Sequence, residues 1–333
     1  MSRLVLVAGV GRSGTSLMTG ILGQVGFHIP QPEINADETN PRGFGEPAWV
    51  VNFHQRVMRR LRLTVFDSRP RAWEVTDRVV QDARVREELR DWLAVELREA
   101  DAVVVKDPRV GWFLPLWTAC ARDLHAPTSF VCMMRHPAEI LASARKWYGD
   151  WQTDASRAAA WLNVMLETER KTREMPRAFV RYEDLLADWE RELRRAGEAM
   201  DDPLLSRIER SKFPSVDEFV DPALHRQRRG WEGLELPERV RELVERVWNE
   251  LQPLADRGGD TPELRSKLDA SHAEYDALYE EAEAISQSSV TAVKPRKQGG
   301  GGATTTASLR VKVARRIPKQ YRRQLRRIVG RSG

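Results

Sequence analysis

The amino-acid sequence predicts an α/β protein built on a central, mostly parallel sheet. Short runs of almost entirely apolar residues recur along the chain, at residues 4–8, 102–105, 130–134 and 178–180. Strands this apolar belong inside a sheet that is covered on both faces. Segments with helical periodicity separate the runs, which favours parallel βαβ units. The 333 residues are 41% hydrophobic and 31% charged, which is typical of a protein with a core and excludes collagen, low-complexity disorder and an integral membrane protein.

The predicted elements follow one another in the order that such a fold requires. The strand at 4–8 ends in a glycine turn, and apolar residues then recur at helical spacing from Leu17 to Val25. Beyond Tyr182 the chain is predominantly helical through Leu254. The helical segments expected before that point are 47–63, 79–100, 110–122, 137–147 and 154–173.

Three further parts are expected beyond the α/β domain at residues 1–256. Residues 261–286 carry apolar side chains at alternating steps of four and three, which is typical of an amphipathic, coiled-coil-like helix; a helix packed on its own domain is the alternative. Residues 287–309, with four consecutive glycines, are expected to form a flexible linker. Residues 310–333 form a basic tail, in which an amphipathic helix can begin at Pro318.

Charge is distributed unevenly between the domain and the tail. Residues 1–293 carry 41 basic and 49 acidic residues, a balance of −8, whereas the last forty carry +13. The acidic domain would repel phosphate except at local patches, so nucleic acid is not an expected partner. The basic tail predicts peripheral contact with an anionic membrane surface. A disordered solubilising tail and attachment to RNA or DNA are the alternatives.

Cysteine usage and the start of the chain predict a location. Only Cys120 and Cys132 are present, too few for a disulfide framework, and the first residues lack the pattern of a secretory signal. We therefore expect a cytoplasmic protein, with peripheral contact at the inner membrane surface through its tail.

The first chemical motif lies between the first strand and the first helix. Residues 9–16 read Gly-Val-Gly-Arg-Ser-Gly-Thr-Ser, so backbone N–H groups and a helix N-terminus point at one anionic site. The spacing of Gly9 and Gly14 matches the loop of nucleoside triphosphatases, but Thr15 stands where that loop carries its lysine. This pattern predicts a P-loop-like, three-layer fold whose phosphate cradle takes its side-chain cation from Arg12. A turn that merely joins strand to helix is the alternative.

A second motif follows the third apolar run. Arg135 comes directly after that run, and Ser143 lies eight residues later on the ensuing helix. A guanidinium offers bidentate donors to a phosphate, and the hydroxyl adds a donor from a second direction. The two motifs together resemble those of sulfotransferases that use 3′-phosphoadenosine-5′-phosphosulfate (PAPS). The first signature of that family, [K/R]-[ST]-G-[TS]-[TS], is matched by Arg12, Ser13, Gly14, Thr15 and Ser16.

Three more segments are similar to the same family. Residues 180–189 read Val-Arg-Tyr-Glu-Asp-Leu-Leu-Ala-Asp-Trp, residues 105–109 read Val-Lys-Asp-Pro-Arg, and residues 40–46 read Asn-Pro-Arg-Gly-Phe-Gly-Glu. The last two resemble the bacterial carbohydrate-type branch, and the Lys-Asp-Pro segment also the tyrosyl-protein branch. Both branches carry arginine in the first cradle, as this chain does. The resemblance spans residues 3–255, so it identifies 1–256 as a sulfotransferase domain.

The resemblance implies transfer of a sulfuryl group from PAPS to a hydroxylated acceptor, a carbohydrate or glycolipid, without a metal. Arg12 and the amides of residues 14–16 would stabilise the departing 5′-phosphate, and Lys106 would reach the sulfuryl group or the bridging oxygen. In the family, residues in the positions of Arg135 and Ser143 hold the 3′-phosphate.

A hydroxyl acceptor also needs a general base, and Glu46 is the first choice. It lies on a glycine-bent loop that is similar to the Asn-Pro-x-Gly-[Phe/Tyr]-x-Glu stretch of the bacterial branch. Glu33, Asp107 and His54 remain open as alternatives. The plain interpretation of Glu46 is an acid that stabilises the start of the helix begun by Pro47.

Two groups of residues have weaker support. A basic loop falls where the family often closes over the 3′-phosphate, although a solvated basic turn is as good an interpretation. Its candidate contacts are Arg228, Arg229 and Gly230. Some tryptophans could line an acceptor cleft, against the commoner fate of core packing. They are Trp49, Trp112, Trp147 and Trp151.

Two other functions remain open at this point. A P-loop-like small-molecule kinase shares the strand, cradle and helix, although the missing lysine counts against it. A nucleotide-binding scaffold that recruits partners to a membrane would use the amphipathic helix and the basic tail without catalysis.

Overall fold

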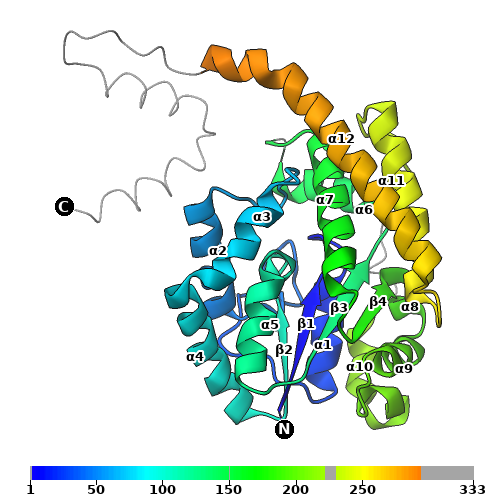
Figure 1. Cartoon of the computed structure of the whole chain (residues 1–333). Coiled ribbons are helices and arrows are strands. Elements are labelled where there is room, and N and C mark those ends of the chain that lie inside the picture. The colour runs from blue at the N-terminus through cyan, green and yellow to red at the C-terminus, as the bar shows by residue number, and fades with distance from the viewer. Residues whose placement is uncertain (1, 150, 222–229, 294–333) are drawn as a thin grey trace. The chain divides into compact units, whose positions relative to one another are not determined.

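The computed structural model describes residues 2–149, 151–221 and 230–293 (Figure 1). Contacts divide the chain into two units, Met1–Ala282 and Glu283–Gly333. The predicted linker beyond residue 293 and the basic tail therefore lie outside the described residues. Along the described ranges, no helix combines the length and apolar character that crossing a bilayer takes.

A four-stranded sheet lies at the centre of the first unit, and every neighbouring pair of its strands is parallel. Its strands are β1 (Arg3–Ala8), β2 (Ala102–Lys106), β3 (Thr128–Met134) and β4 (Arg177–Arg181), in the spatial order β2-β1-β3-β4. Each contains one of the apolar runs, so the predicted parallel α/β fold is confirmed.

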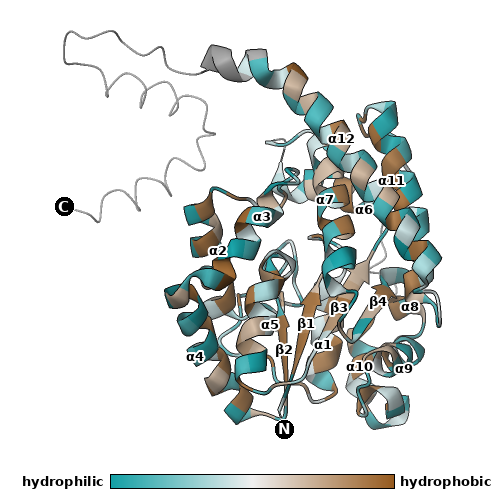
Figure 2. Cartoon of the chain, viewed as in Figure 1, coloured by the Kyte–Doolittle hydropathy of each residue, from teal (hydrophilic) through white to brown (hydrophobic). Residues whose placement is uncertain are grey.

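Side chains alternate along each strand between two separate cores. Leu4, Leu6 and Ala8 of β1 belong to one core, whereas Val5 and Val7 belong to the other. Figure 2 shows mostly brown, hydrophobic strands between helices in which hydrophobic and hydrophilic residues alternate. The alternation along the strands has a period of two, and it gives the three layers that the sequence predicts.

Helices on the two faces of the sheet complete the two cores. The first core receives α2 (Ala48–Leu61), α3 (Ala72–Asp77), α4 (Ala83–Glu99), α5 (Leu114–Asp123), α6 (Pro137–Tyr148), α7 (Asp154–Thr172), α11 (Glu238–Leu251) and α12 (Pro262–Val293). The second receives α1 (Thr15–Gln24), α8 (Tyr182–Ala187), α9 (Trp189–Ala199) and α10 (Pro214–Phe219). Short 3-10 helices are η1 (Arg78–Gln81), η2 (Val110–Phe113), η3 (Leu205–Arg207), η4 (Arg210–Lys212) and η6 (Gln252–Ala255).

Local sequence explains the limits of α6, the helix that carries Ser143. His136 caps its start, because its Nδ1 accepts a hydrogen bond from the Ala138 amide at 3.3 Å, and Pro137 occupies the first turn. The helix ends before Gly149, whose φ of +74° breaks helical geometry.

The long helix α12 corrects one predicted boundary. Its first half packs on its own domain, because Leu264, Leu268 and Tyr275 are buried in the first core. The apolar stripe there is therefore explained by packing within the unit. The helix continues to Val293, through residues 287–293 that were expected to be linker. No proline or glycine interrupts the chain between Pro262 and that point, so nothing stops the helix.

Candidate active site

The carboxyl ends of β1, β2 and β3 meet at one edge of the sheet, and the segments that follow them carry the predicted residues. The chain passes from β1 to its neighbour β2 on one side, and then to β3 on the other side of β1. In open parallel sheets, ligands bind in the crevice where the strand order reverses in this way. The topology therefore makes the crevice above β1 the candidate binding site.

The turn after β1 is shaped to approach other groups closely. An added Cβ at Gly14, where φ is +100°, would lie 2.3 Å from Tyr182 Cδ2, and one at Gly9 would lie 2.7 Å from Ser13 Oγ. Only glycine fits these positions. Arg12 also adopts a left-handed conformation, with φ of 78°. This costs about 1–2 kcal/mol for a residue with a side chain, and such strain is found at functional sites.

The cradle has polar groups that no other part of the described chain satisfies. The Ser13 side chain is buried, and its Oγ has no hydrogen-bond partner among the described residues. No side chain caps the start of α1 at Gly14. An unsatisfied buried polar group costs about 1–3 kcal/mol, so these groups are expected to face a ligand with acceptor oxygens. An anion at the N-terminus of α1 meets that requirement.

The two predicted phosphate-binding turns are in contact, although more than 120 residues separate them. Arg12 donates from Nε to Ser143 Oγ at 3.0 Å and from Nη2 to the Thr39 carbonyl at 3.3 Å. Arg135 donates from Nη1 to the carbonyl oxygen of Arg12 at 3.3 Å. Its Nε is held by Glu139 Oε2 at 2.7 Å. The structure therefore brings Arg12, Arg135 and Ser143 to one place.

Lys106, at the end of β2, joins the cradle to the loop that carries Glu46. Its Nζ donates to Glu46 Oε1 at 2.5 Å, to the Phe44 carbonyl at 3.1 Å and to Ser16 Oγ at 3.2 Å. The Lys106 side chain is 3% exposed and that of Glu46 is 12% exposed. A buried ammonium needs such a complete set of acceptors. The carboxylate of Glu46 is thereby fixed beside the first turn of α1.

Two of the alternative bases lie behind this site, enclosed by protein. The side chains of His54 and Asp107 are fully buried, and Trp117 Nε1 donates to His54 Nε2 at 3.0 Å. The other ring nitrogen of His54, Nδ1, lies 3.4 Å from Asp107 Oδ2. Asp107 also accepts from the Arg109 amide and from Arg109 Nη1, each at 2.7 Å.

These contacts determine the charge of Asp107. Burial acts to raise the pKa of its carboxyl, but His54 and Arg109 outweigh burial and hold that pKa below its ordinary value. The third alternative, Glu33, accepts from Gln31 Nε2 at 2.8 Å and is half-buried. Among these candidates, Glu46 is the carboxylate that reaches α1 through Lys106.

Two aromatic residues that the sequence analysis did not select also lie at the cradle. A Cβ placed on Gly11 would lie 3.3 Å from Phe66 Cζ and 3.9 Å from Tyr148 Oη. The two rings are 5.8 Å apart and tilted by 53°. Burial raises the pKa of the Tyr148 hydroxyl, and the positive charge of Arg12 opposes that rise. The available signal was the position of Tyr148 at the end of the helix that carries Ser143.

The selected tryptophans divide between packed and accessible positions. Trp112 is stacked on Trp73 at 3.9 Å inside the core, and Trp49 is stacked on Trp92 at 4.6 Å. These contacts assign both to packing. Trp147 and Trp151 are accessible; Trp147 is half-buried beneath Lys146, and Trp151 is 61% exposed.

The predicted basic loop is only partly described. Arg228 and Arg229 lie outside the described residues, and Gly230 is exposed. The next residue, Trp231, has its ring 5.6 Å from that of His136, which follows Arg135 in the sequence.

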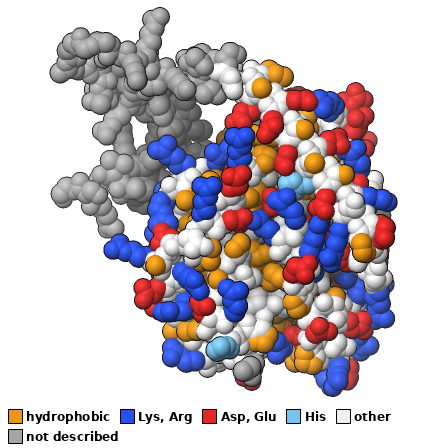
Figure 3. Space-filling view, viewed as in Figure 1, with side chains coloured by type: hydrophobic (Ala, Val, Ile, Leu, Met, Phe, Trp, Pro, Cys, Tyr) orange, Lys and Arg blue, Asp and Glu red, His pale blue; other side chains and the backbone are white. Residues whose placement is uncertain are grey.

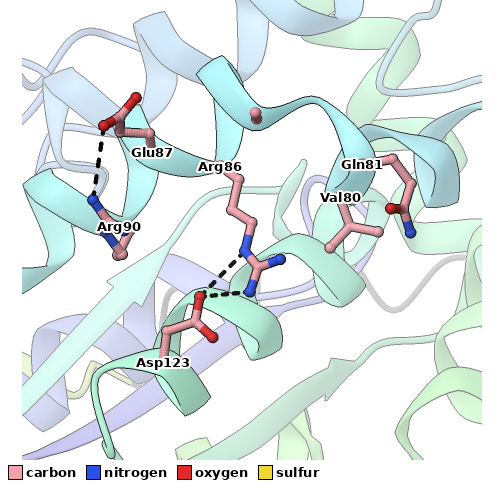
Figure 4. Close-up of a pocket in the computed structure, with 7 residues that line it drawn as sticks. Val80, Gln81, Arg86, Glu87, Arg90 and Asp123 are labelled. Atoms are coloured by element: carbon pink, nitrogen blue, oxygen red, sulfur yellow. Dashed lines mark hydrogen bonds and ion pairs between the residues drawn. The ribbon is translucent and has the colours of Figure 1, made fainter.

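A surface pocket of about 420 Å³ lies elsewhere on the domain (Figure 4). Its lining includes Arg86 and Arg90, and Arg86 is paired with Asp123 at 2.6 Å. None of the cradle residues lines it. Basic and acidic side chains are likewise interspersed over the face of the domain shown in Figure 3.

Within the described ranges, no three His, Cys, Asp or Glu side chains gather as a metal site would require.

Comparison with known proteins gives matches of two kinds. A protein-family model described as "Sulfotransferase family" matches residues 5–204. Among solved structures, the crystal structure of sulfotransferase STF1 from Mycobacterium tuberculosis H37Rv is similar at 14% identity and a TM-score of 0.33, over 66% of this chain and 76% of that one. No curated protein sequence matches the chain.

Proposed function

Because this chain belongs to the sulfotransferase family, whose model matches residues 5–204, we propose that it transfers a sulfuryl group from PAPS to a hydroxyl group of a carbohydrate or glycolipid acceptor. The observation that carries the proposal is the contact between the two phosphate-binding turns, in which Arg135 donates to the Arg12 carbonyl and Arg12 to Ser143. A donor with phosphates at both its 3′ and 5′ positions needs two anion sites within the length of one nucleotide.

The residues of the cradle fit such a donor. The start of α1 offers backbone N–H groups, and Ser13 Oγ is a buried hydroxyl without a partner among the described residues. Arg12 adds the cation that the lysine supplies in nucleoside triphosphatases. Arg135 and Ser143 would hold the 3′-phosphate on the neighbouring turn. PAPS supplies the sulfuryl group and a phosphate as its leaving group.

Transfer requires the acceptor oxygen to attack sulfur in line with the leaving phosphate oxygen. The new S–O bond forms as the bond from sulfur to the bridging oxygen breaks, and negative charge grows on the departing phosphate. Arg12, the amides at the start of α1 and Lys106 would stabilise that charge. Removal of one such donor typically lowers the rate by about 10² to 10³.

We assign Glu46 as the general base of this reaction. The acceptor hydroxyl must lose its proton as its oxygen attacks, and a carboxylate within hydrogen-bond reach can accept it. Glu46 is supported by its ion pair with Lys106 and by the position of both beside Ser16. Asp107 is occupied by Arg109 and His54.

Calorimetry with 3′-phosphoadenosine-5′-phosphate (PAP) and with ATP tests the donor. Tight binding of PAP with weak binding of ATP is expected, whereas preference for ATP would favour a P-loop-like kinase. A screen of hydroxylated acceptors with labelled PAPS tests the transfer. PAP binding without transfer to any carbohydrate or glycolipid would favour a non-enzymatic nucleotide-binding scaffold.

We further propose a cytoplasmic location, with the basic tail at residues 310–333 in contact with anionic lipid at the inner membrane surface. About 1 kcal/mol per basic residue is expected near such a surface. Co-sedimentation with anionic liposomes, for the full chain and for a chain that ends at residue 293, tests this. Unchanged sedimentation after the deletion would contradict the membrane role.

A further inference from the structure

Three side chains converge beside the cradle without a part in the mechanism above. Phe66 and Tyr148 lie against Gly11, and Arg109 follows the segment that carries Lys106 and Asp107. The Tyr148 hydroxyl interacts electrostatically with Arg12, Glu46 and Arg109. Arg109 lies three residues past the end of β2, which pairs with β1, so all three side chains belong to the edge of the sheet where Arg12 and Lys106 lie.

The Arg109 side chain is held in a defined orientation by Asp107. Asp107 accepts from its amide and from its Nη1, both at 2.7 Å, and Asp107 is itself buried against His54. The Arg109 side chain is 16% exposed. Among the described residues, no other group accepts a hydrogen bond from this guanidinium, so its remaining N–H groups are left for a ligand. A guanidinium fixed in this way matches the planar, bidentate geometry of a carboxylate.

The two aromatic rings supply an apolar wall next to this cation. Tyr148 is 43% exposed, so its ring is accessible to a ligand. Phe66 is buried beneath it, and Gln152 Nε2 fixes the loop by donating to the Phe66 carbonyl at 3.2 Å. Aromatic faces of this kind pack well against the C–H face of a sugar ring.

We propose that Arg109, Tyr148 and Phe66 form the acceptor subsite, and that it selects an acidic sugar: a pyranose ring that carries a carboxylate. The ring contacts the two aromatic side chains, and the carboxylate binds the free edge of Arg109. This inference rests on the proposed sulfuryl transfer, and it narrows the carbohydrate class to uronate-type rings.

Two commercial probes separate the contribution of charge from that of the ring. p-Nitrophenyl β-D-glucuronide and p-nitrophenyl β-D-glucoside share one ring and one aglycone and differ at the carboxylate. With protein saturated with PAP, we expect the glucuronide to bind about tenfold or more tightly, in line with a bidentate charged pair. Arg109→Gln is expected to remove most of that difference and to leave glucoside binding within about twofold of the wild type.

Three further variants complete the experiment. Tyr148→Ala is expected to weaken both probes by a similar factor, whereas Tyr148→Phe keeps the ring and most of the affinity. Arg90→Gln, on the surface pocket, is the matched arginine control and leaves both affinities unchanged. If Arg109→Gln does not fold, Arg109→Lys carries the test, because it keeps a positive charge beside Asp107 and loses the planar fork.

The outcomes distinguish this inference from the function on which it rests. Failure of the wild-type protein to bind PAP contradicts the proposed function. Normal PAP binding with equal affinity for the two probes, or with no binding of either, overturns the acceptor subsite alone. Loss of PAP affinity in a folded Arg109 variant also overturns it, because Arg109 would then contact the donor.

Discussion

Exchanging Lys106 for methionine removes the cation from the Glu46 carboxylate while keeping a side chain of similar length. The pair is 2.5 Å apart, and the two side chains are 3% and 12% exposed, so the carboxylate cannot recover full hydration. Leaving one partner of a buried pair uncompensated costs about 3–5 kcal/mol. Because Glu46 retains some contact with solvent, we expect a loss of about 3 kcal/mol in the free energy of unfolding.

The double variant Lys106→Met with Glu46→Gln separates stability from catalysis. A neutral amide does not need the lost ammonium, so much of the stability is expected to return, with a coupling energy of about 1–3 kcal/mol between the two positions. Activity is expected to stay at least about 10² below that of the wild type, because both the proposed sulfuryl-side cation and the proposed base are absent.

Urea unfolding measures the stability of the four proteins in this cycle, and release of PAP from PAPS in the presence of an acceptor measures turnover. A double variant that is as unstable as the sum of the single variants would refute a direct buried interaction. Near-normal turnover of folded Lys106→Met would refute the catalytic role of the amine.

Three other substitutions test neighbouring parts of the site. Arg12→Ala is expected to abolish turnover while the circular dichroism spectrum stays that of the wild type; turnover near the wild-type rate would remove Arg12 from the mechanism. Gly14→Ala places a Cβ 2.3 Å from Tyr182 Cδ2 at a φ of +100°, so calorimetry is expected to show loss of PAP binding, and unchanged affinity would contradict the close approach. Because the pKa of Asp107 is held below its ordinary value, its charged form contributes stability above about pH 4, and this contribution is lost as pH falls through the lowered pKa. Asp107→Asn is therefore expected to destabilise the protein near pH 7 and to have progressively less effect in acid, as measured by unfolding at several pH values; a difference that does not vary with pH would contradict this sign.

The sequence predicts Arg12, Arg135 and Lys106 as neighbours because each follows an apolar run. Parallel strands bring their carboxyl ends to one edge, so residues that follow those ends meet whatever their separation along the chain. The same reasoning does not predict the position of Glu46, because its loop does not follow a strand. The ion pair with Lys106 is a tertiary contact, and no local pattern specifies it.

Phe66 and Tyr148 could not be predicted by that reasoning. Phe66 lies in an irregular segment between α2 and α3, and the direction of Tyr148 depends on how α6 is rotated against the sheet. The extension of α12 to Val293 was missed for a different reason. The apolar pattern ends at Ile285, whereas the absence of a helix breaker lets the backbone continue.

Helix α6 connects the proposed 3′-phosphate site to the proposed acceptor subsite. It begins two residues after Arg135, carries Ser143 against Arg12 and ends at Tyr148. Twelve residues span about 18 Å, so one helix would connect a nucleotide held by Arg135 and Ser143 to the ring of Tyr148. Binding of donor and acceptor at the two ends of this helix is therefore expected to be coupled, and thermodynamic reciprocity makes the effect of each on the affinity of the other equal.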